Sequence, residues 1–373
     1  MTMKIIDRYI IQEIVKPMIV VCLVLVSIFA GYCATRYLAD ATVGLLSAKT
    51  VFNLILLKVV IALEVLLPTT IYLSVVVGLG RLYTDLEMTA LESCGVKRSR
   101  IYRNVLLIAI LVSLLVASLS LFIRPWAYRT AYQLKNFEES HFKIKRMEPA
   151  AFYELESGKR VIFAQQVNRQ EQRAQQVFIH SKVEGKQQII TAKEVSQQTN
   201  PLNDNDTLVF RDGTIFELSS AGRGDTTVGF KQYTLSLSPP EATPITKIKA
   251  TPTSNLIHSD KSLAIAELQW RFSTPLTAII LALLGIPLSQ TSPRRGKYAK
   301  VVLAVVIYSI FYTLSLVTKT WIGERVISPW PGIWGIEGVM ALLLLITTIS
   351  FFQKWHGLYE FLRKHHSYTT EKP

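Results

Sequence analysis

The chain has 373 residues, half of them hydrophobic, and a formal net charge of +14. Its mean hydropathy of +0.29 is above the usual range of soluble globular proteins and predicts a membrane protein. The Lys and Arg residues stand beside apolar runs, so we interpret the charge as a determinant of membrane orientation and not as a nucleic-acid-binding surface.

The N-terminal segment 1–17 is predicted to form an interfacial helix. Ile6, Ile10 and Ile14 recur at helical spacing with charged and amide side chains between them, which is typical of a helix at a membrane surface. The charges are spread through the segment and no small-residue cleavage site follows, so we do not expect a signal peptide.

Six segments are long and apolar enough to span a bilayer, which requires about 20 residues. They are 18–38, 52–80, 104–123, 272–292, 301–321 and 332–353. The stretches after the second, fourth and sixth segments are rich in Lys and Arg and should be cytoplasmic. Both ends, including the tail 354–373, are then cytoplasmic, and the segment between the third and fourth spans lies on the far side of the membrane.

The central segment 124–266 is predicted to be a β-rich domain with flanking linkers. It continues helically past Pro125-Trp126, and from Ala151 onward about seven short β-prone runs are separated by Gly, Asn, Asp and Pro. Asp212-Gly213 predicts a hairpin turn, and residues 239–259 resemble a linker. The expected fold class is α+β: six transmembrane helices (3+3), here 18–123 and 267–353, with an all-β, jelly-roll-like domain inserted between helices 3 and 4.

The sequence contains none of the common catalytic or metal-binding motifs. There is no Gly-rich phosphate loop, no His-Glu-x-x-His run, no Gly-x-Ser-x-Gly and no Cys/His cluster. We therefore expect no catalytic residue, metal site or cofactor in this chain, and a partner would have to supply the energy for any work.

Four ionisable residues lie in or near the predicted spans: Arg36, Lys58, Glu64 and Lys319. A charge within a span costs about 2.5–3.5 kcal/mol unless it faces a cavity, a partner or the interface. Each side chain could extend to the headgroups, or the three cations could line a site for an anionic amphiphile. Glu64 lies six residues from Lys58, so it does not share a helix face with Lys58 and needs another partner.

The basic loop after the second span is predicted to contain a short helix, 84–95. Thr84 followed by Glu87 forms a capping-box pattern, and Gly95 is a helix stop. Leu86 and Leu91 give this helix an apolar side. It is either a surface helix or a docking helix for an energy-supplying cytoplasmic partner, and the two interpretations are compatible.

Two sequence blocks resemble the LptF/LptG (YjgP/YjgQ) family of lipopolysaccharide export permeases. One runs from Gly80 to Gly95, and the other from Ala266 to Arg271, continuing into Pro287-Leu288-Ser289 and Pro293-Arg294-Arg295-Gly296. Pro125-Trp126 and the 3+3 arrangement match as well, so the likeness covers essentially the whole chain. Within the family, the LptF branch is favoured by the pairs Tyr83-Thr84, Cys94-Gly95 and Trp270-Arg271.

The resemblance implies a permease subunit of an ABC transporter in the bacterial inner membrane. Such a subunit pairs with an LptG-like second permease on two copies of an LptB-like ATPase, which binds the ATP and Mg. The complex extracts lipopolysaccharide and passes it to LptC-like and LptA-like periplasmic jelly-roll proteins for outer-membrane assembly. The central β domain would then be periplasmic.

Two groups of site residues are expected. Arg36 and Lys319 fall where the family has basic residues at the outer helix ends, and with Lys58, which the charge pattern adds, they are the expected substrate-binding residues. Glu87 falls in the family's coupling helix, so the expected ATPase-coupling residues are Thr84, Leu86, Glu87 and Leu91. Glu64 does not match the family pattern.

Two other functions are alternatives to a permease. A membrane-bound lipid-modifying enzyme should show carboxylate or histidine clusters at the membrane face, and the sequence has none. A structural membrane anchor for the β domain would need neither charged outer helix ends nor a capped cytoplasmic helix.

Overall fold

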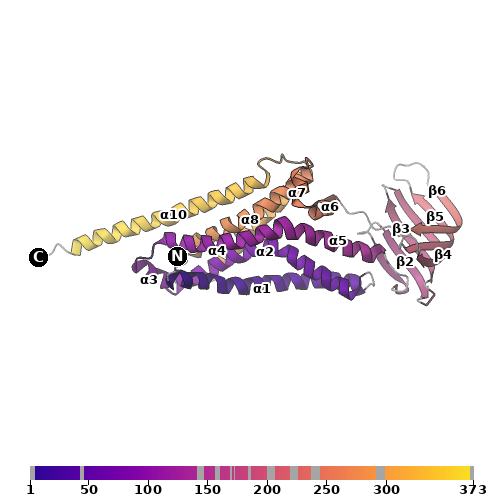
Figure 1. Cartoon of the computed structure of the whole chain (residues 1–373), viewed down its shortest axis with the longest axis horizontal. Coiled ribbons are helices and arrows are strands. Elements are labelled where there is room, and N and C mark those ends of the chain that lie inside the picture. The colour runs from indigo at the N-terminus through magenta and orange to yellow at the C-terminus, as the bar shows by residue number, and fades with distance from the viewer. Residues whose placement is uncertain are drawn as a thin grey trace. The chain divides into compact units, whose positions relative to one another are not determined.

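The computed structural model describes residues 5–42, 46–140, 147–155, 160–168, 170–171, 173–183, 186–199, 206–218, 226–236, 244–290 and 299–369, the last part from residue 351 as backbone only. These residues form two compact units (Figure 1). The helical unit consists of Met1–Phe29, Val59–Tyr128 and Pro244–Pro373. The other unit consists of Ala30–Lys58 and Arg129–Thr243 and contains the sheet.

Among the residues that the structure describes, six helical segments are long and apolar enough to cross a membrane, which confirms the predicted number of spans. The first two are α1 (Ile5–Thr42) and α2 (Ala48–Thr84), and the third is continuous through α4 (Arg98–Ser118), the π-helical turn η1 (Leu119–Ile123) and α5 (Arg124–Ser140). The last three are α8 (Ser262–Ser289), α9 (Ala299–Gly323) and α10 (Gly332–Thr369). Three short helices, α3 (Glu87–Ser93), α6 (Pro244–Ala250) and α7 (Thr253–Ile257), connect longer elements.

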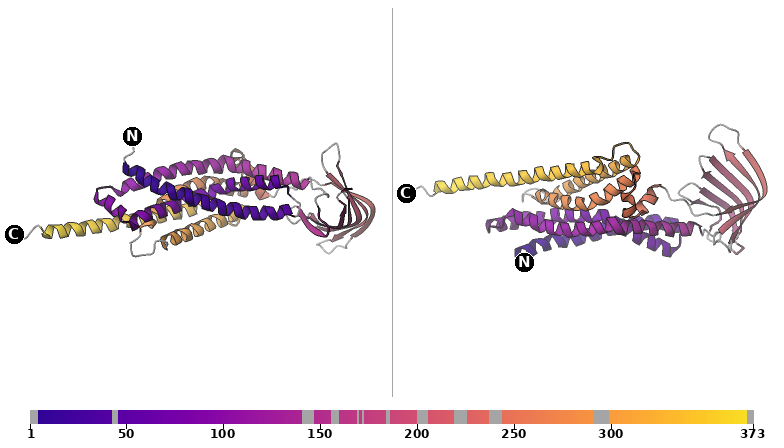
Figure 2. Two further views of the ribbon diagram at one scale, coloured as in Figure 1. Left: turned by 90° about the horizontal axis from the view of Figure 1, so that it is seen from below. Right: turned by 45° about the horizontal axis from the view of Figure 1, so that its top comes forward.

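The segment between the third and fourth spans is β-rich, as predicted. Its strands are β1 (Ala151–Leu155), β2 (Arg160–Asn168), β3 (Arg173–Val183), β4 (Lys186–Thr199), β5 (Asp206–Leu218) and β6 (Thr226–Ser236). They form one antiparallel sheet in the order β1-β2-β3-β4-β5-β6, which is visibly curved (Figure 2). A cluster that includes Tyr153, Ile179 and Phe210 forms its apolar core.

The predicted hairpin at Asp212-Gly213 is wrong. Both residues lie inside β5, whose pairing register with β4 and β6 continues unchanged on either side of them. A Cβ atom at Gly213 would collide with the Thr191 carbonyl oxygen and the Phe230 ring. The glycine is therefore needed for a close approach within the sheet and not for a turn, and two of the seven expected strands are one.

The predicted N-terminal interfacial helix is the first part of α1. The helix runs unbroken through Pro17, and its apolar stripe is buried in the bundle, where Ile10 and Ile14 are both 0% exposed. Pro17 has no N–H to donate to the carbonyl of Glu13, four residues earlier. Gly78 of α2 packs directly against this carbonyl, where a Cβ atom would overlap it.

Proline also shapes the third and fourth spans. Pro125 cannot donate to the Leu121 carbonyl four residues earlier, and the Thr253 hydroxyl donates to that carbonyl instead at 2.6 Å. Pro275 likewise frees the Arg271 carbonyl, which lies 3.1 Å from the Ser120 hydroxyl. Hydroxyl groups commonly satisfy such carbonyls in membrane helices.

The segment predicted as a linker, 239–259, is more ordered than expected where the structure describes it. From residue 244 onward it forms α6 and α7, and Leu256 is buried. Residues 237–243 lie outside the described part of the chain.

Candidate functional site

A network of buried charges joins α2, η1, α5 and α8. Glu64 is 1% exposed, and its carboxylate accepts hydrogen bonds from Arg124 Nη1 at 2.7 and 2.8 Å. The Ser120 hydroxyl lies 2.8 Å from the same carboxylate, and the Trp270 indole N–H donates to it at 3.2 Å. Glu64 thus has the separate partner that its spacing from Lys58 required.

Glu267 of α8 is the centre of this network. Its carboxylate lies 3.2 Å from Arg124 Nη2, 3.2 Å from Arg271 Nε and 2.7 Å from Lys319 Nζ. The ammonium of Lys319 also lies 4.6 Å from the centre of the Trp270 ring, a cation–π geometry. One carboxylate therefore pairs with cations from the third, fourth and fifth spans.

Arg271 extends the network to the segment that returns from the sheet. This fully buried guanidinium donates to the carbonyl oxygens of Lys249 and Thr251, each at 3.1 Å, and to the Thr253 hydroxyl at 2.8 Å. The Thr253 hydroxyl then donates to the Leu121 carbonyl. A single arginine therefore fixes α6 and α7 to the membrane helices.

The network carries a positive excess. Among the described residues, the carboxylates paired with Arg124, Arg271 and Lys319 are those of Glu64 and Glu267, so three cations meet two anions. Lys249 lies nearby over the Tyr128 ring, and burial, followed by repulsion from Arg124, lowers the pKa of its ammonium below the usual value. An anionic group would reduce this excess charge.

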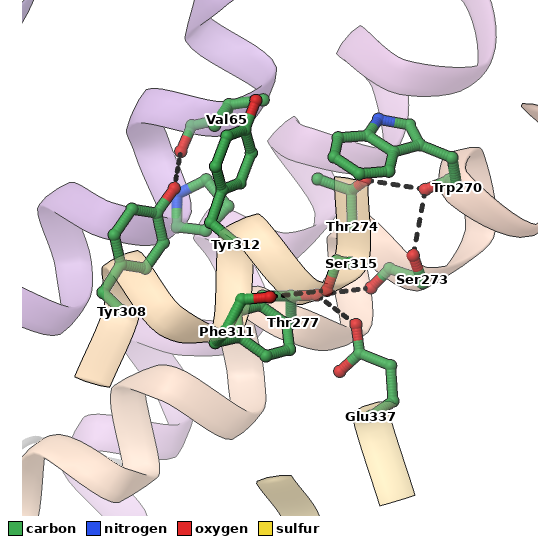
Figure 3. A pocket seen from close by; sticks show the side chains of 11 residues that line it. Val65, Trp270, Ser273, Thr274, Thr277, Tyr308, Phe311, Tyr312, Ser315 and Glu337 are labelled. Carbon is green, nitrogen blue, oxygen red and sulfur yellow. Dashed lines mark hydrogen bonds between the residues drawn. The ribbon is translucent and has the colours of Figure 1, made fainter. Parts of the chain in front are cut away.

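A small cavity lies beside the network, between α2, α8, α9 and α10 (Figure 3). Its volume is about 30 Å³, enough for one or two water molecules. Glu337 lies at its edge, is buried, and accepts a hydrogen bond from the Thr277 hydroxyl. No cation contacts Glu337 among the described residues, so it differs from Glu64 and Glu267.

The predicted cytoplasmic helix exists as α3, but the predicted capping box is wrong. Thr84 belongs to α2, where its hydroxyl donates to the Gly80 carbonyl at 2.9 Å. The residue that precedes α3 is Leu86, whose backbone has the left-handed conformation with φ 61°. The helix stop at Gly95 is confirmed, because Gly95 has φ +84° and its N–H donates to the Glu92 carbonyl.

The start of α3 is held by α1. The Tyr9 hydroxyl donates to the Glu87 carboxylate. On the same part of α1, Asp7 forms a paired contact with Arg100 at 2.6 and 3.0 Å, and Glu13 binds Arg81 at 3.0 Å. The first turns of α1 therefore contact α2, α3 and α4 through charged groups.

The structure brings together only some of the expected substrate-binding residues. Arg36 is exposed, and it and Lys58 both lie close enough to the Cys33 thiol to act on it electrostatically. Lys319 belongs to the buried network, where it already has Glu267 as a partner. Sequence reasoning treated these three cations alike, but their environments differ.

The expected coupling residues also differ from one another. Leu86 is 56% exposed, Glu87 and Leu91 are half-buried, and the buried apolar residue of α3 is Met88. Thr84 is the last residue of α2 and its hydroxyl donates to the Gly80 carbonyl in that helix. The outward apolar side predicted for the helix is thus limited to Leu86 and the small residues beside it.

Comparison with known proteins identifies the family. The model of the lipopolysaccharide export system permease LptF/LptG matches residues 8–350. The chain belongs to the LptF/LptG family. The permease LptF of Escherichia coli K12 is similar over 92% of this chain and 94% of its own length, at 23% identity, and LptF of Shigella flexneri is similar to the same extent.

In this LptF/LptG family member, sequence reasoning missed four of the residues described above: three in the buried charge network and one in the contact between α1 and α3. Arg124 follows an uncharged span directly, and Glu267 and Arg271 are four residues apart in the Ala266–Arg271 block, so both features could have indicated them. Tyr9 gave no signal, because only the fold brings it to Glu87.

Proposed function

We propose that this chain is the LptF-like permease subunit of an ABC transporter that extracts lipopolysaccharide from the bacterial inner membrane. The family match over residues 8–350 carries this proposal. The six candidate spans and the sheet between the third and fourth support it. The LptF proteins of E. coli and Shigella are named as permeases of lipopolysaccharide export, and the proposal extends that role to this chain.

The proposed complex contains an LptG-like second permease and two LptB-like ATPase subunits, which hydrolyse the ATP. LptC-like and LptA-like periplasmic proteins would receive the lipid. In support, α3 presents the exposed Leu86 next to the Glu87 carboxylate, which suits a partner with an apolar groove and a basic side chain. Copurification of the subunits and stimulation of ATPase activity by lipopolysaccharide test the proposal. A purified complex whose rate of ATP hydrolysis does not change when lipopolysaccharide is added would contradict the proposal.

The proposed orientation can be tested with the chain's own cysteines. Cys94, after α3, is exposed, whereas Cys33 is buried. In spheroplasts, a membrane-impermeant maleimide should label Glu171→Cys, in the turn between β2 and β3, without permeabilisation. Native Cys94 should react only after permeabilisation, because basic loops stay in the cytoplasm. Labelling in the opposite order would reverse the proposed topology.

Arg36 is the cleanest test of substrate contact. We propose that it meets a phosphate of the lipid, and because it is exposed, its replacement should leave the fold intact. Arg36→Asp removes a charge-assisted bond worth about 1.5–3 kcal/mol and adds repulsion. The lipopolysaccharide concentration for half-maximal ATPase stimulation should rise roughly 10- to 150-fold.

Two further variants complete this experiment. Arg36→Lys keeps the charge and should be close to wild type. Lys319→Asp is a poorer probe, because it would place a second carboxylate next to Glu267. Unchanged stimulation with Arg36→Asp would show that Arg36 only extends to the headgroups.

A further inference from the structure

Tyr9 is half-buried and lies where α1 meets the coupling helix. Its ring packs against the apolar cluster that contains Leu82 and Met88. Its hydroxyl donates to the carboxylate of Glu87, 78 residues later in the chain. The side chain that the proposed function directs to the ATPase is therefore already bound to the first membrane helix.

This contact is one of three on the same short stretch of α1. Asp7 is 5% exposed and also accepts a hydrogen bond from Asn104 of α4 at 2.9 Å, in addition to its pair with Arg100. Glu13 is 6% exposed and pairs with Arg81 at the end of α2. Together these contacts join the first turns of α1 to the helices on both sides of α3.

Helix packing makes this junction rigid. The close approach of Gly78 to the Glu13 carbonyl leaves no space for even a Cβ atom, and close-packed helices transmit strain to one another. Beyond Pro17, α1 changes character, because Ile19, Val20 and Leu23 are each about 60% exposed. A displacement of α3 therefore acts at the buried end of a helix whose next turns leave apolar side chains exposed.

We propose that Tyr9 is a positioning residue that couples α3 to α1, so that nucleotide-driven movement of α3 displaces the first membrane helix. This inference rests on the proposed function. Glu87 then has two tasks. Its charge attracts the ATPase, and its hydrogen bond with Tyr9 transmits the movement of α3 to α1. The hydroxyl of Tyr9 contributes to the second task only.

The two tasks can be separated by two conservative substitutions. Tyr9→Phe keeps the ring and the Glu87 charge but removes the donor. Glu87→Gln removes the charge but keeps an oxygen that accepts from Tyr9. Both variants should be studied in the full complex of both permeases and the ATPase, reconstituted in vesicles containing lipopolysaccharide.

We expect Tyr9→Phe to copurify with the ATPase at the wild-type level and to hydrolyse ATP at the basal rate. The amount of lipopolysaccharide released per ATP should fall roughly tenfold or more, the range that the loss of one hydrogen bond to a charged group supplies. Glu87→Gln should show the reverse pattern, with less bound ATPase and normal release per ATP hydrolysed. Glu13→Gln, which weakens the neighbouring contact with Arg81, should lower release per ATP as Tyr9→Phe does.

Three outcomes would overturn the inference. The first is release of lipopolysaccharide by the Tyr9→Phe complex with wild-type efficiency. The second is loss of ATPase subunits from this complex, as expected for Glu87→Gln. The third is a fall in the melting temperature of the Tyr9→Phe protein in proportion to its loss of transport. Failure of the wild-type complex to respond to lipopolysaccharide would contradict the proposed function instead. The experiment therefore distinguishes the two.

Discussion

Replacing Glu267 by Gln should destabilise the protein by about 3–5 kcal/mol, the usual cost of removing one partner from a buried ion pair. The neutral amide would face Arg124, Arg271 and Lys319, which now contact its carboxylate at 2.7–3.2 Å. Repulsion among these cations would no longer be offset. Thermal unfolding of the purified protein in detergent should show a clearly lower midpoint and less folded protein in the membrane.

The matched control is the same substitution at Glu337. Glu337 is also buried in the bundle, but its bonded partner is the Thr277 hydroxyl, and no cation contacts it in the described part of the chain. A glutamine there still accepts from Thr277, so stability should change by less than about 1 kcal/mol. Equal destabilisation by the two substitutions would show that burial alone, and not the three cations, explains the importance of Glu267.

Glu87→Lys should produce the second large effect, in assembly and not in folding. We expect the variant to insert and to pair with the proposed second permease, because Glu87 is only partly buried at the start of the short helix α3. Reversal of a charge that meets a basic partner costs about 2–5 kcal/mol of binding, so the ATPase should be largely lost on purification. The measurement is the ratio of ATPase to permease in the purified complex.

Graded variants define this result. Glu87→Gln should lose less ATPase than Glu87→Lys, and Tyr9→Phe should lose none, because it leaves the charge in place. Full recovery of the ATPase with Glu87→Lys would mean that Glu87 serves only its contact with Tyr9, and the docking surface would lie elsewhere.

The membrane spans could be predicted from the sequence because apolar length alone defines them. Their ends could not. The predicted fourth span begins at residue 272, whereas α8 begins at Ser262, because Glu267 and Arg271 look too polar for a membrane helix. Glu267 pairs with Arg271 and also with Arg124 and Lys319, which are distant in the sequence, and a hydropathy pattern contains no information on such pairs.

Predictions from local motifs were wrong where tertiary contacts determine the conformation of the motif residues. Thr84 and Glu87 have capping-box spacing, but α2 continues to Thr84, and Glu87 bonds to α1. Asp212-Gly213 has the composition of a hairpin turn, but packing under Phe230 explains the glycine. Gly95 was predicted correctly, because its positive φ is a local backbone requirement.

The buried network also constrains how the protein is made. Arg124 and Glu267 are 143 residues apart, so at ribosomal speeds roughly 10–30 s separate their synthesis. In that interval Arg124 can pair with Glu64, which has already been made. The hydroxyl of Thr253, which donates to the Leu121 carbonyl, and the carboxylate of Glu267, the second partner of Arg124, have not yet been made. The hydrocarbon core offers no replacement for either partner. We therefore expect the newly made first half to stay beside the insertion machinery, or another protein, until the fourth span emerges.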